Sequence, residues 1–406
     1  MDSSTLTIRT LTEDDIPAFV EVLSNAFLND ANSDWENFER RAFEPGRSLG
    51  VFDGARLVGC GKIITKQITV PGLRVTPVAA VSCVGVAADH RRRGVLSRMM
   101  RAQLHGLHET GGEPFAALWA SESPIYGRYG YGFASQAVGF DLLKGAEFRP
   151  ETDFGADRIR ELPLAEATPL LEAIYQKVAP SRIGWLTRSA TAWEEVLVDV
   201  EHLRGGISAR RFAVHPEGYA VYRTKGGRDE RGPSGEMEVV EIVAGTPQAY
   251  ASLWRYLLSV DLVAKIHARL GSDEALVHLL AEPMNVIRRH HPALWVRLVD
   301  LDRALTARRY SGPVDLVLEV DDELCPWNAG RWRLHVDASG EAEVTRTEAD
   351  ADLALGIVEL GAAFLGGTRL STLASAGRVR ERTEGGIARA SAAFLGEQDP
   401  SCVEVF

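Results

Sequence analysis

The sequence predicts an α/β protein of two or three domains, and three observations support this prediction. The chain has 406 residues, of which 45% are hydrophobic and 25% charged, as is ordinary for a soluble globular protein. Over roughly the first three quarters of the chain, strand-like apolar runs alternate with amphipathic helical segments, as in an α/β fold. The remaining quarter places strand-like runs before helical ones, as in an α+β domain.

The beginning of the chain predicts a pair of helices and a hairpin. Thr12-Glu13-Asp14-Asp15 precedes an apolar-periodic run to Phe27, which indicates an N-capped helix with acidic residues in its first turn. A second short helix is expected over residues 33–43. The alternating stretch 49–70, with a turn at Asp53-Gly54, predicts a β-hairpin.

The next segment combines a strand, a polar corner and a helix. The Val- and Ala-rich run 78–87 predicts a buried strand, and apolar residues recur at helical spacing after Gly94. Arg91, Arg92 and Arg93 occupy the corner between the two. The first N–H groups of a helix favour an anion, Gly94 allows close approach, and arginines add charge-assisted contacts. The corner therefore predicts a pyrophosphate site; the alternative is a solvated basic turn.

The rest of the chain repeats the alternation of strand and helix before the pattern changes. A strand is expected over 114–119 and a Tyr-Gly loop over 126–132, with a domain boundary near 149–153. In the next unit we expect helices at 165–178, 192–197 and 249–259, strands at 211–215, 218–222 and 237–243, and a mobile hairpin tip at 224–236. In the last unit we expect strands at 314–320, 331–336, 342–346 and 351–357 and helices at 358–365, 371–376 and 386–395.

Charge and composition exclude several classes of function. The net charge of −11 argues against a general nucleic-acid binder and is compatible with a cationic substrate. The N-terminus has no signal-peptide pattern and no apolar run of membrane-spanning length occurs, so we expect a cytoplasmic protein that does not bind a membrane. Cys60, Cys83, Cys325 and Cys402 form no CxxC pair, so we expect free thiols and no metal site.

Two further segments, together with this corner, resemble a known protein family. Arg91 and Gly94 match the acetyl-CoA signature of the GCN5-related N-acetyltransferases (GNAT), although Leu96 stands where that signature has a small residue. Together with the segment 118–133 and the ending Glu404-Val405-Phe406, the corner resembles that of the enhanced intracellular survival (Eis) family of aminoglycoside N-acetyltransferases, in which a hydrophobic pair follows the glycine. The resemblance covers nearly the whole chain.

The resemblance implies a domain plan. Two tandem GNAT-like domains are expected at 1–150 and 151–300, the first catalytic and the second without cofactor, followed by a sterol-carrier-like α+β domain at 301–406. The family also implies a homohexamer. Acetyl-CoA is the expected co-substrate, with no metal, and its binding residues are expected to be Val84, Gly85, Val86, His90, Arg91, Arg92, Arg93, Gly94, Val95, Leu96 and Ser121.

Two groups are expected to move protons. Tyr126 matches the family's general acid, which protonates the departing thiolate, and a tyrosine differs in pKa from a thiol by only about 1.5 units. The family's base is the terminal carboxylate, here that of Phe406. Its pKa lies about seven units below that of an alkyl ammonium, so we expect it to collect the proton during or after attack.

The acceptor follows from complementarity of charge and shape. A polyamine such as an aminoglycoside suits a pocket with carboxylates and ring faces. The resemblance places the helix pair at 12–43 beside that pocket. The candidate substrate-binding residues are Phe27, Asp30, Trp35, Trp119 and Glu404. Trp119 stands where the best-known relatives carry His, so the pattern of acetylated amines is left open.

Three functions are compatible with these residues. The first is an acetyl-CoA-dependent aminoglycoside N-acetyltransferase that acts on several amines and confers resistance. The second keeps the chemistry but takes a protein lysine as acceptor. The third is a non-catalytic protein whose last domain binds an apolar ligand. Tyr126, Arg91, Gly94 and a terminal carboxylate without an added tail favour an enzyme.

Overall fold

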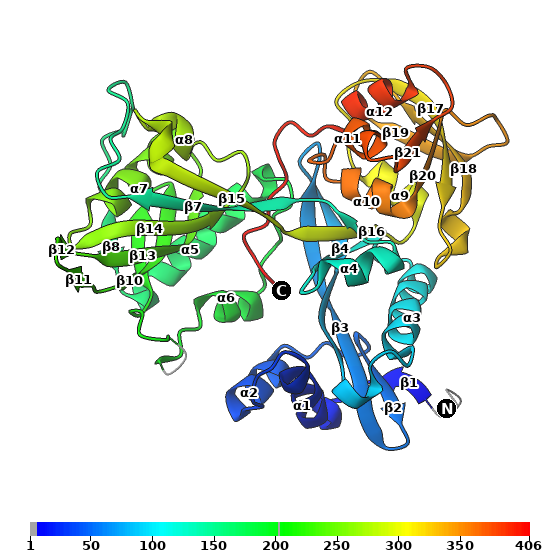
Figure 1. Cartoon of the computed structure of the whole chain (residues 1–406), viewed down its shortest axis with the longest axis horizontal. Coiled ribbons are helices and arrows are strands. Elements are labelled where there is room, and N and C mark those ends of the chain that lie inside the picture. The colour runs from blue at the N-terminus through cyan, green and yellow to red at the C-terminus, as the bar shows by residue number, and fades with distance from the viewer. Residues whose placement is uncertain (1–5, 202–203) are drawn as a thin grey trace. The chain divides into compact units, whose positions relative to one another are not determined.

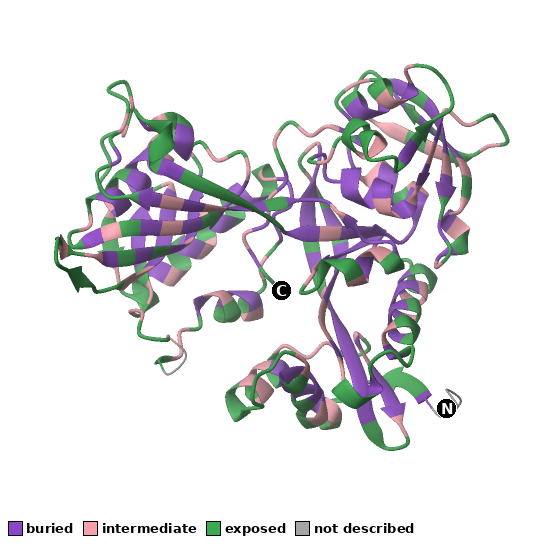
Figure 2. Ribbon diagram, viewed as in Figure 1, coloured by how far each residue is buried: buried purple, intermediate pink, exposed green. Residues whose placement is uncertain are grey.

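The computed structural model describes residues 6–201 and 204–406, which form two compact units (Figure 1). The first unit contains the residues up to Ala134 together with Leu294–Glu397 and Val405–Phe406. The second contains Ser135–Ala293 and Gln398–Glu404. Buried residues follow the central strands of each unit, and the outer helix faces are exposed (Figure 2).

The first unit is built on a seven-stranded sheet in the described part of the chain, in the order β1-β2-β3-β4-β5-β16-β6. The expected helix pair and hairpin are confirmed, and Thr12 opens the first helix by donating its backbone N–H to Asp15 at 2.8 Å. The strands are β1 Leu6–Thr10, β2 Ser48–Asp53, β3 Arg56–Val70, β4 Arg74–Val86, β5 Phe115–Trp119, β16 Leu294–Leu298 and β6 Gly132–Phe133. The helices are α1 Ile16–Ala26, α2 Ser33–Arg41, α3 Val95–Thr110, α4 Ser123–Tyr126 and α9 Leu301–Ala307.

One strand of this sheet comes from a distant part of the sequence. β16 pairs antiparallel with β5 on one side, from Leu294 opposite Trp119 to Leu298 opposite Phe115, and with β6 on the other. The sequence-based division at residue 300 places this strand in the second domain. Its residues are almost all buried, because it has a neighbour on both edges. A short apolar run does not indicate which sheet it will join.

The second unit repeats the same kind of layout. In the described residues its sheet has the order β15-β7-β14-β13-β10-β9-β8, and the parallel pair β13–β14 is joined through α7. The strands are β7 Gln136–Leu143, β8 Arg160–Leu162, β9 Arg211–His215, β10 Gly218–Lys225, β13 Gly235–Ala244, β14 Val263–Leu270 and β15 Val286–Pro292. A small hairpin, β11 Arg228–Asp229 with β12 Gly232–Pro233, forms the expected tip. The helices are α5 Leu164–Val178, α6 Ala190–Leu197, α7 Pro247–Ser259 and α8 Leu276–Leu279.

The C-terminal part of the first unit is the expected α+β arrangement. Its described sheet has the order β19-β18-β17-β20-β21, in which β17 and β20 run parallel. The strands are β17 Val314–Asp321, β18 Gly330–Val336, β19 Ala342–Arg346, β20 Leu353–Gly356 and β21 Val379–Glu381. The helices are α10 Ile357–Ala363, α11 Leu370–Ser375 and α12 Gly386–Phe394.

Helix α10 packs on the first sheet through two glycines. A Cβ at Gly132 would meet the backbone of Val358 and Ala362, and one at Gly361 would meet the carbonyl of Val296. The helix and the strands β6 and β16 can approach this closely only because neither glycine carries a side chain. The last domain is therefore fixed onto the sheet that carries the loop after β5.

Gly132→Ala is expected to destabilise the first unit by about 1–3 kcal/mol, because the added methyl meets backbone atoms that cannot rotate away. Chemical denaturation followed by circular dichroism measures the loss. The matched control is Gly106→Ala on α3, where nothing lies within 4 Å of the added Cβ. That change should be neutral or stabilising through helix propensity. Equal stability of the two variants would contradict the close packing.

Candidate active site

Strands β4 and β5 separate after two residue pairs. They pair in parallel at Ala79–Ala116 and Ala80–Ala117, and within these fully described strands no further pair follows, although β4 continues to Val86. The edge of β4 that faces β5 is thus open from Val81 onward. Val84 and Val86 are half-buried there, so their backbone groups can bond an extended ligand such as a pantetheine arm.

The strand is distorted at the same place. The pairing of β3 with β4 shifts register between Cys60 and Lys62, and Cys83 adopts a positive φ of 53°. A positive φ is uncommon for a residue with a side chain and is enriched at functional sites. This bulge changes the direction of β4 at the start of its open edge.

The corner after β4 leads into a helix N-terminus that no side chain caps. Arg92 and Gly94 both have positive φ, 62° and 79°, and no side chain caps the first turn of the 16-residue helix α3. Arg91, Arg92, Arg93 and Gly94 are exposed. Free N–H groups at the positive end of the helix dipole and three exposed guanidinium groups suit a pyrophosphate. The predicted geometry of strand, corner and helix is therefore present.

His90 supports this corner from within the protein. Its side chain is 5% exposed; Nδ1–H donates to Asp89 Oδ1 at 2.9 Å and Nε2–H to Asp53 Oδ2 at 3.0 Å. Because carboxylates only accept, both bonds require the charged imidazolium, and they raise the pKa of His90. The family resemblance predicts a contact of His90 with acetyl-CoA; in the structure both ring nitrogens bind carboxylates.

Stability should therefore depend on pH through His90. A raised folded-state pKa contributes stability that is fully present below the unfolded value of about 6.5 and is lost as pH rises through the folded pKa. We expect His90→Gln to lower the unfolding temperature at pH 6 and to differ less from the wild type at pH 9. Differential scanning calorimetry at both pH values measures this. A difference that grows with pH would contradict the charged state of His90.

Gly85 brings the end of helix α1 against β4. A Cβ at Gly85 would lie 2.9 Å from Leu23 Cδ2 and 3.4 Å from Ala26 Cβ, so the two elements pack closely at this glycine. Ala26 is the last residue of α1, and Phe27 follows it with 43% exposure. Asp30 in the next turn is also exposed. The aromatic and acidic turn between α1 and α2 therefore begins beside the open edge of β4.

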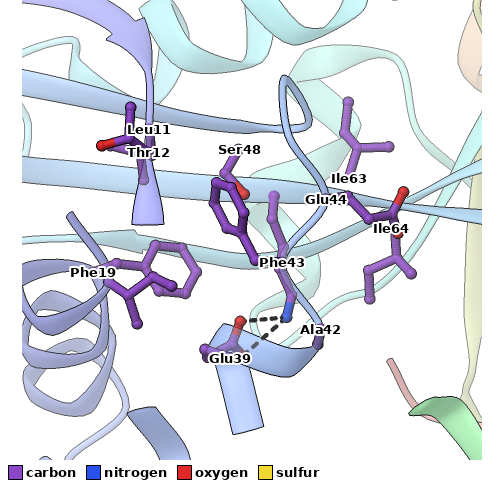
Figure 3. Close-up of a pocket in the computed structure, with 12 residues that line it drawn as sticks. Leu11, Thr12, Phe19, Glu39, Ala42, Phe43, Glu44, Ser48, Ile63 and Ile64 are labelled. Carbon is purple, nitrogen blue, oxygen red and sulfur yellow. Dashed lines mark hydrogen bonds and ion pairs between the residues drawn. The ribbon is translucent and has the colours of Figure 1, made fainter. Parts of the chain in front are cut away.

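Trp35 is hydrogen-bonded to one partner of a buried ion pair between α2 and β3. Its Nε1–H donates to Glu39 Oε1 at 3.2 Å. Lys62 Nζ donates to both oxygens of Glu39, at 2.9 and 2.8 Å (Figure 3). The pair fixes α2 onto β3, and it lines a cavity of about 10 Å³. That volume holds about one water molecule and no amine substrate. Glu39 and Lys62 belong to no sequence motif, so the sequence alone does not predict this pair.

Tyr126 ends the short helix α4 and is buried among residues of the open edge. It belongs to an apolar cluster against which Val84 and Leu96 pack. Burial raises the pKa of Tyr126 to about 12, although a side-chain hydrogen bond with Ser121 lowers it. The tyrosine therefore keeps its proton throughout the physiological range. Its difference from a thiol grows to about 3.5 units, or roughly 5 kcal/mol, so Tyr126 is a weaker acid than the unperturbed value implies.

The remaining candidates are distributed over both units. Trp119 is half-buried at the end of β5, opposite Leu294. Phe406 is half-buried and groups with the first unit, which also holds Tyr126. Glu404 lies in the second unit, where it is 5% exposed and accepts a hydrogen bond from Arg188 Nε at 3.0 Å. Val84, Leu96, Ser121 and Tyr126 are thus joined by described contacts.

The described residues contain neither a metal-ligand cluster nor a membrane-spanning helix. Within 6–201 and 204–406, no group of three or more His, Cys, Asp or Glu side chains is arranged to hold a metal ion. No helix in the same ranges is both long and apolar enough to cross a membrane.

Comparison with family models agrees with the three-part organisation. Residues 7–134 match an acetyltransferase (GNAT) domain, residues 184–298 match a second acetyltransferase (GNAT) domain, and residues 301–403 match a sterol carrier protein domain. The predicted fold class, two GNAT domains followed by a sterol-carrier-like domain, is thereby confirmed.

Relatives match over the full length of the chain. An uncharacterized N-acetyltransferase from Streptomyces avermitilis is 39% identical over 401 residues, covering 96% of this chain and 97% of the relative. The N-acetyltransferase Eis of Mycobacterium tuberculosis is 33% identical over 405 residues, covering 97% and 98%. The crystal structure of Eis1 from Mycobacterium abscessus superimposes with a TM-score of 0.86 at 31% identity, covering 99% and 100%. The chain is a GNAT-type N-acetyltransferase and belongs to the Eis family.

Proposed function

We propose that this N-acetyltransferase uses acetyl-CoA to acetylate amines of small polycations, aminoglycoside antibiotics among them, at several positions, and so confers resistance. The observation that supports this most is the turn after α1. It carries Phe27 and Asp30 in exposed positions and begins one residue after Ala26, which lies against Gly85 of the open strand. Ring faces and carboxylates beside the strand that holds the thioester suit a cationic amine.

Acetyl-CoA binds along the open edge of β4 and at the corner before α3. Arg91, Arg92 and Arg93 with the first N–H groups of α3 hold the pyrophosphate, and the backbone of Val84 and Val86 bonds the extended arm. Acetyl-CoA supplies an acetyl group on a thioester that an amine can attack. The bulge at Cys83 turns the strand where that thioester would lie.

Proton transfer is assigned to two groups. Tyr126 Oη holds a proton for the departing sulfur, and the Ser121 hydrogen bond stabilises the tyrosinate that remains. The carboxylate of Phe406, which groups with the same unit as Tyr126, collects the proton that the amine releases. An added residue would move this carboxylate away.

The experiment measures CoA release with acetyl-CoA and a panel of aminoglycosides, beside a lysine-containing peptide. We expect turnover with aminoglycosides and a large loss of kcat when one glycine is appended after Phe406. Mass spectrometry of the products counts the acetylated amines. Turnover with the peptide alone would replace the antibiotic by a protein acceptor. Thermal stabilisation by acetyl-CoA without any turnover would overturn the assignment to these amines, because ligand binding raises stability independently of chemistry.

A further inference from the structure

The second unit contains its own opening between parallel strands. β13 and β14 pair from Gly235–Val263 to Val239–Ala268, and β13 then continues to Ala244. Helix α7 connects them, as α3 connects β4 and β5 in the first unit. Both acetyltransferase-like domains thus have the same β-α-β arrangement, with a separation of strands at the corresponding place.

The turn before α7 lacks the features of the corner before α3. It reads Gly245-Thr246-Pro247, with no basic residue, and Thr246 Oγ1 caps the helix by accepting the N–H of Ala249 at 3.3 Å. Pro247 removes another N–H from the first turn. The helix end that would bind a pyrophosphate is therefore already occupied by the chain's own side chain.

The C-terminal segment Gln398–Glu404 contacts residues that follow β14. The backbone N–H of Asp399 donates to Asp273 at 3.2 Å, and Ser272 Oγ donates to the Asp399 carboxylate at 2.8 Å. A Cβ at Gly271 would lie 3.1 Å from Ser401 Cβ. The segment is thus attached along the end of β14.

The same segment is bonded to the loop before α6. The N–H of Ser401 donates to the Ile183 carbonyl at 3.0 Å, and Trp185 Nε1–H donates to Ser401 Oγ at 3.1 Å. Between these two residues Gly184 has a φ of 89°, and a Cβ there would collide with the Ser401 carbonyl. The loop is therefore shaped to receive the segment backbone.

A buried guanidinium joins the end of this segment to β13. Arg188 Nε donates to Glu404 at 3.0 Å, while its Nη1 and Nη2 donate to the two oxygens of Glu241 at 3.2 and 2.7 Å. The three side chains are 1, 5 and 4% exposed. Tyr219 Oη also donates to Glu241 at 3.1 Å, and the Arg188 guanidinium lies over the Tyr175 ring at 3.9 Å.

The charges explain why this contact is strong. One guanidinium serves two carboxylates away from water, so loss of Arg188 leaves two buried carboxylates without a counter-charge, whereas loss of Glu404 leaves the Arg188–Glu241 pair intact. The Glu404 carboxylate is engaged inside the second unit and is not presented to solvent as a contact for a cationic substrate. Phe406, which carries the terminal carboxylate, follows Glu404 by two residues. An extended chain of that length spans at most about 7 Å between the two Cα atoms.

We propose that the second acetyltransferase-like domain holds the C-terminal segment in its strand opening, with Arg188 and Glu241 clamping Glu404. Arg188, Glu241 and Glu404 are positioning residues, which act through the placement of Phe406. The effect on catalysis, through the position of the Phe406 carboxylate, rests on the proposed function. The binding of the segment by Arg188 and Glu241 does not depend on it.

Carboxypeptidase digestion of the full-length protein, followed by intact mass measurement, tests the clamp. In the wild type, the enzyme should remove Phe406 and then Val405, which is 60% exposed, and should stop at Glu404, which is buried. Glu404→Ala leaves the Arg188–Glu241 pair in place, and trimming into residues 398–403 should be about tenfold faster. Arg188→Met should act in the same way, and Arg188→Lys should partly restore protection. The control is Arg211→Met, which breaks the exposed pair with Glu161 and should not change trimming.

Kinetics separate a positioning role from a substrate contact. If Glu404 positions Phe406, Glu404→Ala lowers kcat about tenfold or more and leaves the KM for the amine nearly unchanged. Unchanged trimming with a raised amine KM would overturn the proposal and return Glu404 to the substrate pocket. If Arg188→Met does not fold, Glu404→Ala decides the outcome. The two proposals can also be separated. If Glu404→Ala is trimmed faster but the wild type acetylates no amine, the proposed function is refuted and the clamp is supported.

Discussion

Tyr126→Phe lowers kcat by about 10²-fold or more, because general acid catalysis typically contributes 10²–10⁴-fold. The ring stays in the apolar cluster with Val84 and Leu96, so the KM for acetyl-CoA should change little. Steady-state CoA release with a saturating amine measures both constants. Since burial raises the pKa of Tyr126 to about 12, the wild-type enzyme should show no alkaline loss of kcat from this group up to about pH 10.

The control for this change is Tyr129→Phe. The Tyr129 hydroxyl lies 3.1 Å from Ser97 Oγ, and its ring belongs to the same cluster. Its removal should leave kcat within about threefold of the wild type. Equal losses in the two variants would show that hydroxyl groups of this cluster matter for packing rather than for proton donation.

Asp322→Ala is expected to destabilise the first unit by about 3–5 kcal/mol, because it leaves the buried Arg297 guanidinium without its counter-charge. Arg297 Nη2 lies 2.8 Å from both oxygens of Asp322, and the two side chains are 0 and 2% exposed. Asp322 also accepts from the N–H of Cys325 at 3.1 Å and from Asn328 Nδ2 at 3.0 Å. Guanidinium-induced unfolding followed by tryptophan fluorescence measures the loss.

The control removes a carboxylate of the same type from the surface. Asp315 pairs with Arg333, but both side chains are about half exposed, at 45 and 54%. Exposed pairs contribute little, so Asp315→Ala should cost less than about 1 kcal/mol. A similar loss in both variants would contradict the role assigned to burial. Arg297 belongs to β16 and Asp322 follows β17. A large loss of unfolding free energy in Asp322→Ala, without a similar loss in Asp315→Ala, would therefore support a role of this pair in holding the last domain on the first sheet.

Local patterns determined most of the elements that were predicted correctly. The capping sequence at Thr12, the turn at Asp53-Gly54 and the helix after Gly94 each depend on neighbours within a few residues, and the structure confirms them. The corner at Arg91–Gly94 is of the same kind. Tyr126 and Phe406, in contrast, were selected by resemblance, since a tyrosine in a Gly-rich loop and a chain terminus have no pattern of their own.

The sequence by itself therefore determined the alternation of strands and helices and the strand, corner and helix around Arg91–Gly94, because these depend on short-range periodicity and on spacing within one segment. The three-part fold and the family followed from the resemblance to Eis proteins, which the comparisons confirm. The tertiary structure alone decided that β16 enters the first sheet, that both ring nitrogens of His90 bind carboxylates, and that Arg188 donates a hydrogen bond to Glu404. Each of these joins groups whose charges or backbone bonds are satisfied only when distant parts of the chain are packed away from water. The pKa of Tyr126 was likewise set by burial, a property of the packed structure that no single segment carries.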